Sequence, residues 1–263
     1  MVTCPPISQR RWPSPRRAIV GARMVKSAGD GPWPAPLLIA SAVMQPDPLT
    51  RHSWVWLAEG WAGCLRGRPT AEAIALAERW RGLDQPFIVA SPGAHDGADD
   101  LRLGLALPDK RRIGLHLPRA AVVRSAPPPS LRQVVAQAPA AWRPRLREVE
   151  TMVQAAGFSV AVYGSLAWEY RCGTAYVRAD SDVDLLFDGQ ATPPLEPVLA
   201  LVQALSADAS APWLDGELIL PGGAAVAWRE FARRPEELLI KGAGGPALCT
   251  RASIEALFAR AAA

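Results

Sequence analysis

Every second residue is hydrophobic in two neighbouring stretches of the first half of the chain. Leucine occupies alternate positions over residues 101–107, and residues 113–117 repeat the pattern after a turn at Pro108. This alternation predicts a β-hairpin with one face on a core. Thr70 precedes a run with helical spacing that ends near Trp80, so it is expected to cap a helix. Together these elements predict a small α+β module.

Three consecutive prolines at positions 127–129 interrupt the pattern and predict a semi-rigid linker. We therefore expect an N-terminal module over residues 44–126 and a second domain over residues 130–263. In the second domain, Pro144 is expected near the start of a helix, and residues 158–163 are expected to form a strand. The predicted class is α/β (α+β).

The basic charge is concentrated at the start of the chain. The whole protein has a formal net charge of +4, but residues 1–43 carry six basic residues against Asp30 alone. The remainder is near neutral, so charge indicates no nucleic-acid partner. Residues 1–43 are also rich in proline and lack periodicity, which predicts either a disordered tail or a true translation start at Met24 or Met44.

Composition excludes several other classes of protein. Hydrophobic residues make up 49% of the chain, yet no apolar run approaches the ~18–20 residues that a membrane helix needs. We expect no membrane partner and a cytoplasmic protein. The cysteines are far apart and form no C-x-x-C pair, so they indicate neither a zinc site nor a disulfide framework.

The candidate chemistry lies after the strand predicted at residues 158–163. Gly164 and Ser165 follow it directly, and Asp182 and Asp184 begin another β-prone run after sixteen intervening residues. Strand side chains alternate, so the two aspartates share a face about 7 Å apart along the chain. Carboxylates at that separation can contact one divalent ion and share a second. The pattern therefore predicts a metal site.

The neighbouring residues suggest how phosphates would bind. Gly164 lets a phosphate approach the backbone, and Ser165 offers a hydroxyl and an N–H group at a predicted helix start. A third carboxylate is expected on an adjacent strand, where it completes the metal shell and deprotonates the attacking hydroxyl. Asp215 is the first choice and Glu217 the second, although Asp215 also suits a turn before a strand.

Basic residues are needed for the remaining phosphates. Arg111 and Arg112 follow the predicted hairpin turn, and Lys241 ends an apolar run before a glycine-rich turn. A guanidinium group matches phosphate geometry. Each of these side chains equally suits an exposed, solvated position with no ligand. A two-metal reaction needs no cysteine or histidine nucleophile, and the histidines are isolated in the sequence: His52, His95 and His116.

The sequence from Gly164 to Asp188, GSLAWEYRCGTAYVRADSDVDLLFD, resembles the nucleotidyltransferase signature of the malonate decarboxylase holo-acyl-carrier-protein synthases, also called phosphoribosyl-dephospho-CoA transferases. Residues 51–57, 105–115 and 239–246 are also similar to that family. The resemblance covers about residues 49–258. It implies a nucleotidyltransferase-like domain with a mixed sheet, preceded by the small N-terminal module.

The resemblance also implies an activity. Such proteins join triphosphoribosyl-dephospho-CoA to a serine of the malonate decarboxylase acyl carrier protein and release pyrophosphate. With Mg²⁺ as the expected cofactor, Asp182, Asp184 and Asp215 would hold the metal. Gly164, Ser165, Lys241, Arg111 and Arg112 would bind phosphate.

Two other interpretations remain at this stage. The same motifs suit a nucleotidyltransferase that acts on a small molecule or on a toxin–antitoxin target. The chain could instead be a non-catalytic module that binds a carrier protein, although intact Gly-Ser and Asp-x-Asp motifs argue against that. Labelling of the acceptor distinguishes the three.

The basic segment gives a first prediction. Deletion of residues 1–43 should leave the melting temperature and the transfer activity essentially unchanged, because the segment lacks an apolar pattern and lies outside the resemblance. Thermal unfolding and activity of the shortened and full chains would be compared. An insoluble or inactive shortened protein would show that the segment packs on the fold.

Overall fold

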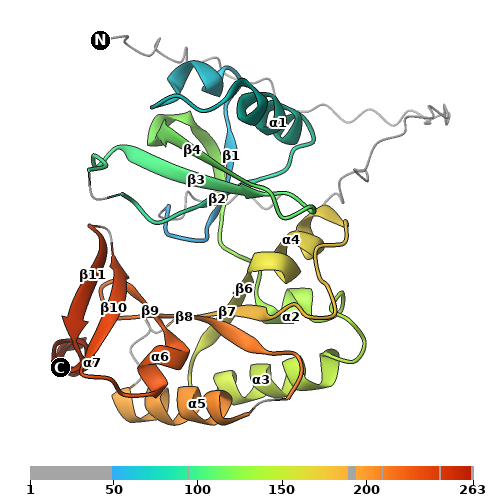
Figure 1. Cartoon of the computed structure of the whole chain (residues 1–263). Helices are drawn as coiled ribbons and strands as arrows, with labels where there is room; N and C mark the ends of the chain where they lie inside the picture. The colour runs from blue at the N-terminus through green and yellow to red at the C-terminus, as the bar shows by residue number, and fades with distance from the viewer. Residues whose placement is uncertain (1–48, 94, 189–193, 209, 243, 262–263) are drawn as a thin grey trace, which may run out of the picture.

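The computed structural model describes most of the chain, namely residues 49–93, 95–188, 194–208, 210–242 and 244–261. The described residues form two β-sheets, one built before residue 127 and one after residue 158, with helices packed on them (Figure 1). The α+β class expected from the sequence is confirmed. The segment expected to be a tail, residues 1–43, lies outside the described residues.

The N-terminal sheet is antiparallel and has the strand order β4-β3-β2-β1-β5. Its elements are β1 (Trp54–Leu57), the short 3-10 helix η1 (Trp61–Cys64), α1 (Ala71–Gly82), β2 (Phe87–Val89), β3 (Asp100–Ala106), β4 (Arg112–Pro118), the 3-10 helix η2 (Arg119–Ala121) and β5 (Val122–Ala126).

The predicted hairpin is the β3–β4 pair. Leu103 lies opposite Leu115 in the register, and both are buried in a core that also contains Trp80 of α1. Thr70 caps α1 as expected, because its hydroxyl accepts a hydrogen bond of 3.1 Å from the backbone of Ala73. The alternating leucines therefore fix which face of the hairpin meets α1, and the opposite face is left for other contacts.

The C-terminal sheet is mixed and has the strand order β11-β10-β9-β8-β7-β6. Strands β7 and β8 are parallel, and the other neighbours are antiparallel. The elements are α2 (Leu131–Val134), α3 (Arg143–Ala155), β6 (Ser159–Tyr163), α4 (Gly164–Cys172), β7 (Val183–Asp188), α5 (Leu195–Ala207), β8 (Leu214–Ile219), β9 (Ala225–Ala227), α6 (Trp228–Ala232), β10 (Glu237–Gly242), β11 (Gly245–Thr250) and α7 (Arg251–Ala261).

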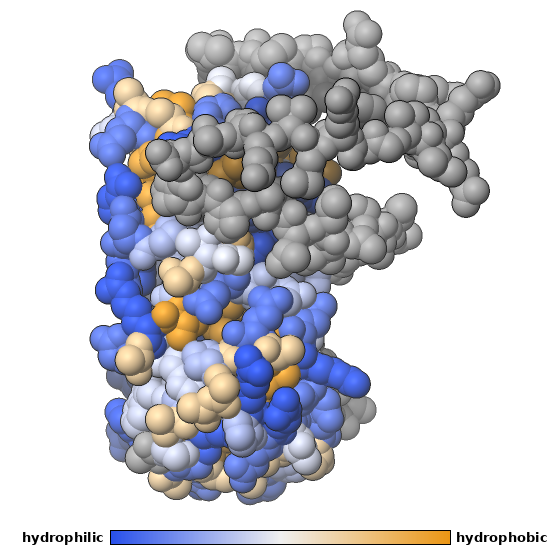
Figure 2. Space-filling view, turned by 90° about the vertical axis from the view of Figure 1, so that its right-hand side faces the viewer, coloured by the Kyte–Doolittle hydropathy of each residue, from blue (hydrophilic) through white to orange (hydrophobic). Residues whose placement is uncertain are grey.

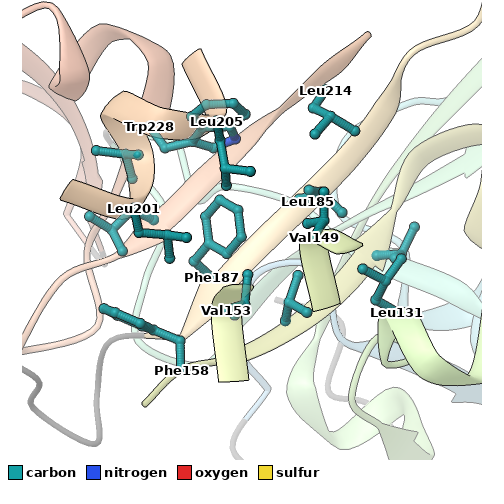
Figure 3. Packing of buried hydrophobic residues seen from close by; sticks show 14 of the residues in the cluster. Leu131, Val149, Val153, Phe158, Leu185, Phe187, Leu201, Leu205, Leu214 and Trp228 are labelled. Atoms are coloured by element: carbon teal, nitrogen blue, oxygen red, sulfur yellow. The ribbon is translucent and has the colours of Figure 1, made fainter. Parts of the chain in front are cut away.

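One face of this sheet packs into the main hydrophobic core. Phe187 of β7 lies at its centre among side chains of α3 and α5, as Figure 3 shows. Its ring meets the Trp228 ring edge-on, with 5.8 Å between the centroids. Because side chains alternate along a strand, burying Val183, Leu185 and Phe187 turns Asp184 to the opposite face. That opposite face faces the N-terminal half.

The two halves share packed side chains. Helix α4 follows β6 in the chain, yet its Trp168 packs in the N-terminal core and meets the Trp80 ring at 5.5 Å between centroids. Arg171 of α4 donates a 2.8 Å hydrogen bond to the Asp84 carbonyl, and the Tyr176 hydroxyl donates one of 3.1 Å to the Ala106 carbonyl. Helix α4 therefore holds the N-terminal sheet over the C-terminal one.

The close approach of β7 and β8 yields a stability prediction. Gly216 has a φ of +133°, and a Cβ there would overlap the Leu185 carbonyl oxygen and lie 2.7 Å from its carbonyl carbon. Gly216→Ala should therefore lower the free energy of unfolding by about 3 kcal/mol or more, as urea denaturation would measure. Gly114→Ala is the matched control, because a Cβ at this exposed strand position meets nothing within 4 Å. Equal effects of the two substitutions would contradict the explanation.

Candidate active site

The turn from β6 into α4 positions the first residues of the site. Gly164 begins α4 with a φ of +68°, a conformation that favours glycine. A Cβ on Gly164 would overlap the Asp184 carboxylate and lie 2.9 Å from its Cγ. Glycine at this position therefore lets the Asp184 side chain lie directly against the start of α4. The Asp184 carboxylate thus occupies the space beside Gly164 where a phosphate was expected.

Three carboxylates come together at this end of the sheet. Asp184 lies beside Asp215 in the parallel β7–β8 register, and Asp182 directly precedes β7. Burial, followed by the charges of Asp182 and Asp215, raises the pKa of Asp184 to about 7. The three carboxylates are therefore close enough to repel one another. A bound cation would reduce this repulsion.

The carboxylates suit a hard metal ion in chemistry but are not closed around one. Within the ranges that the structure describes, no three His, Cys, Asp or Glu side chains are arranged to hold a metal. Carboxylate oxygens are nevertheless the ligands that Mg²⁺ takes in phosphate-transferring enzymes. The donor set of Asp182, Asp184 and Asp215 fits that ion, and the side chains would have to converge to bind it.

A pocket of about 470 Å³ opens over these residues, between the two halves of the protein. Its floor contains Gly164, Ser165, Asp182 and Asp184, and its wall comes from the pocket-facing side of the β3–β4 hairpin. The volume is in the range of small-ligand sites. Asp215 is not among the lining residues, and its Oδ1 accepts a 2.8 Å hydrogen bond from the backbone of Gly216.

The structure separates the two neighbouring arginines that were expected to bind phosphate. Arg112 lines the pocket, and its charge acts to lower the pKa of Asp184 against the larger effect of burial. Arg111 instead forms ion pairs with Asp109 at 2.7 Å and Glu72 at 3.1 Å, outside the pocket. Arg111 precedes β4, and its guanidinium group is held by these two carboxylates. Lys110, which was not predicted to bind phosphate, lines the pocket with Arg112.

Glu217, the second choice for the third carboxylate, is buried in a cluster of positive groups. Its Oε2 is contacted by Arg51 and by the ring of His52 at 3.0 Å, and its Oε1 accepts a 2.7 Å hydrogen bond from Lys241. Both oxygens are engaged, so metal binding would require these contacts to break. The arrangement favours Asp215 over Glu217 as the third carboxylate.

His52 links this cluster to the pocket. Its ring stacks on the Tyr163 ring with 3.9 Å between centroids, and both residues line the pocket. Burial, with smaller contributions from the charges of Arg51 and Lys241, lowers the pKa of His52 to about 3. The imidazole is therefore neutral at pH 7, and the ring nitrogen next to the Glu217 carboxylate carries the proton.

Lys241 lies in a different pocket from the Asp182 and Asp184 carboxylates. It lines a second pocket of about 270 Å³ together with Arg51. Lys241 still interacts electrostatically with Asp215, whose charge acts to raise the pKa of Lys241. Burial has the larger effect, so the pKa of Lys241 is lowered overall. Of the residues expected to bind phosphate, Gly164, Ser165 and Arg112 line the first pocket, Lys241 lines the second, and Arg111 lines neither.

Arg51 and Tyr163 were not selected from the sequence as site residues. Tyr163 lies directly before Gly164, so its proximity to the motif was visible, but the residue type alone indicated no role. Arg51 lies 166 positions away from Glu217 in the chain, and no local pattern connects them. Only the folding of one half against the other brings the pair together.

A carboxylate-lined pocket with cationic side chains in its wall is typical of enzymes that transfer phosphate-bearing groups. The family comparisons agree with that class. The model of the phosphoribosyl-dephospho-CoA transferase MdcG N-terminal domain matches residues 50–128, and the model of the C-terminal domain matches residues 130–252. The chain therefore belongs to the phosphoribosyl-dephospho-CoA transferase family. It is a transferase, which sets aside the non-catalytic interpretation.

Individual proteins support the same family. The chain is 37% identical over 199 residues to a phosphoribosyl-dephospho-CoA transferase of Bradyrhizobium diazoefficiens. The aligned region covers 74% of this chain and 87% of that protein. The chain is 33% identical over 207 residues to one of Xanthomonas campestris, covering 78% and 95%, and 28% identical over 226 residues to one of Pseudomonas aeruginosa, covering 83% and 92%. No solved structure is significantly similar.

Hydrophobic residues form small separate groups among hydrophilic ones on the face shown in Figure 2, outside the area covered by grey atoms. None of the helices in the described ranges combines the length and the apolar character that crossing a bilayer requires.

The raised pKa of Asp184 predicts a pH-dependent stability. In metal-free protein the folded state favours protonated Asp184, so this contribution is complete below about pH 4 and is lost as pH rises towards about 7. Asp184→Asn stays neutral. Its stability advantage over the wild type should therefore grow between pH 5 and pH 8, by on the order of 2–4 kcal/mol.

Urea denaturation in the presence of a chelator would measure this difference at both pH values. His52 is unchanged in the variant, so its opposite pH dependence cancels in the comparison. Exposed Asp99→Asn controls for the amide substitution itself. An advantage of Asp184→Asn that is the same at both pH values would contradict the raised pKa of Asp184.

Proposed function

We propose that the protein transfers triphosphoribosyl-dephospho-CoA to a serine of the malonate decarboxylase acyl carrier protein and releases pyrophosphate. Family membership supports transfer of a phosphoribosyl-dephospho-CoA group. The single observation that carries the chemistry is the grouping of Asp182, Asp184 and Asp215 at one end of β7 and β8, beside a pocket whose wall contains Lys110 and Arg112. The metal ion that accompanies a triphosphate would supply positive charge between these carboxylates and the phosphates.

In the proposed reaction, the serine oxygen forms a bond to the α-phosphorus, and the bond from that phosphorus to the bridging oxygen of the pyrophosphate breaks. The product is a phosphodiester and free pyrophosphate. Asp215 would accept the serine proton, because it lies next to Asp184 in the β7–β8 register. Malonate decarboxylase is the source of the acceptor implied by the sequence resemblance.

The cofactor proposed is Mg²⁺, held by Asp182, Asp184 and Asp215. Bound Mg²⁺ would offset the charge that develops on the leaving pyrophosphate. Ser165 would orient a phosphate oxygen with its hydroxyl and with the N–H groups at the start of α4. Arg112 and Lys110 would hold the outer phosphates from the opposite wall, so the triphosphate would be enclosed by both halves of the protein.

Transfer to the carrier protein tests this proposal. Purified protein with Mg²⁺ and triphosphoribosyl-dephospho-CoA should raise the mass of the carrier subunit and release one pyrophosphate for each transfer. Asp182→Ala and Asp184→Ala should each reduce the rate by on the order of 10³-fold, because lost metal contacts cost several kcal/mol in the transition state. Mass spectrometry of the carrier and a pyrophosphate assay would measure both products.

Two controls define the result. A carrier with its serine replaced by alanine should stay unmodified. Glu148→Ala removes an exposed carboxylate from α3, on the other side of the sheet, and should keep the wild-type rate. Near-normal turnover by both aspartate variants would disprove the assignment of the site. Transfer of a nucleotide from ATP to a small hydroxyl acceptor, without carrier labelling, would show the small-molecule activity instead.

A further inference from the structure

The second pocket lies on the same face of the C-terminal sheet as the carboxylates but shares no lining residue with the first pocket. Arg51 and Lys241 are its cationic residues, and hydroxyl groups of Thr50, Ser130 and Ser159 lie around it. The remaining lining is largely apolar. Such a pocket suits a ligand in which an anionic group is joined to less polar groups.

Glu217 holds the two cations in place. Its side chain is only 4% exposed, whereas those of Arg51 and Lys241 remain 24% and 33% exposed. A single carboxylate balances one of the two positive charges, and His52 adds no negative charge. Glu217 therefore keeps the exposed ends of Arg51 and Lys241 on a fixed support, from which they can donate charge-assisted hydrogen bonds to an anion.

Asp188 also lines this pocket, so its influence has to be considered. It lies at the end of β7 and brings one negative charge to the lining, against the two positive charges of Arg51 and Lys241. The positive end of the pocket is the end where Arg51 and Lys241 meet.

The strand register gives the separation between the two pockets. The row of Asp184 and Asp215 is followed two residues later by Leu186 and Glu217, and two residues after that by Asp188 and Ile219. Each two-residue step along a strand is about 7 Å. The second pocket therefore begins one to two steps, about 7–14 Å, beyond the carboxylates.

The proposed substrate carries two separate anionic groups. Its triphosphate is attached to a ribose, and its dephospho-CoA part contains a diphosphate between adenosine and pantetheine. At least one ribose separates these groups, so they cannot occupy one subsite together. We propose that Arg51 and Lys241 bind the diphosphate of the dephospho-CoA part while the triphosphate lies over Asp182 and Asp184. This assignment rests on the proposed function.

The chain allows a direct test without mutation, because it contains only three lysines: Lys26, Lys110 and Lys241. Lys110 lines the first pocket and Lys241 lines the second. The wild-type protein would be treated with an amine-modifying reagent, and modification of each lysine would be followed by mass spectrometry. Dephospho-CoA should slow modification of Lys241 at least fivefold, and tripolyphosphate with Mg²⁺ should instead protect Lys110.

Two variants give an independent readout. Lys241→Met should raise the Kd of dephospho-CoA at least tenfold and change that of tripolyphosphate less than twofold, while Lys241→Arg should restore most of the affinity. Arg112→Met should show the opposite preference. Titration calorimetry would measure binding, and thermal unfolding would show that each variant folds.

The outcomes separate this inference from the proposed function. Protection of Lys110 but not Lys241 by dephospho-CoA, or equal loss of both probes in Lys241→Met, would overturn the second subsite and leave the transfer reaction standing. If the wild-type protein binds neither probe, the proposed function fails together with the inference. Selective protection of Lys241, matched by a selective loss of dephospho-CoA affinity in Lys241→Met, supports the assignment.

Discussion

The close parallel pairing of β7 with β8 is the constraint on which the site depends. Gly216 leaves room for the Leu185 carbonyl, so the two backbones meet where a side chain would separate them. The register that results places Asp184 next to Asp215. Gly164 plays the matching role at the start of α4, where the missing side chain makes space for the Asp184 carboxylate. Two glycines therefore determine where three negative charges meet.

Glu217 organises the other side of the same sheet face. It comes from β8, only two residues after Asp215, yet its partners come from both halves of the protein. Arg51 and His52 lie before β1, and Lys241 lies on β10. Loss of these partners would leave a buried charge unpaired and strongly destabilise the folded protein. The contacts thus fix the position of the N-terminal half and, through the stacking of His52 on Tyr163, the edge of the pocket.

The electrostatic pattern of the face follows from these two arrangements. The carboxylates of Asp182, Asp184 and Asp215 lie at one end, and the exposed cationic ends of Arg51 and Lys241 lie about 7–14 Å away. Arg112 and Lys110 add positive charge from the wall opposite the carboxylates. A substrate with phosphate groups at two separate points, one of them carried with a metal ion, is complementary to this pattern.

Local sequence patterns determined much of the fold and part of the site. The alternating leucines predicted the β3–β4 hairpin, Thr70 predicted the start of α1, and the order of strand, Gly-Ser and Asp-x-Asp predicted the β6–α4–β7 unit, because each depends on residues close together in the chain. Only the tertiary structure turned Arg111 away from the pocket, enclosed Glu217 among cations, and placed Lys241 beside Arg51. Those outcomes depend on the packing of segments that lie up to 190 positions apart in the chain, and no local periodicity encodes such contacts.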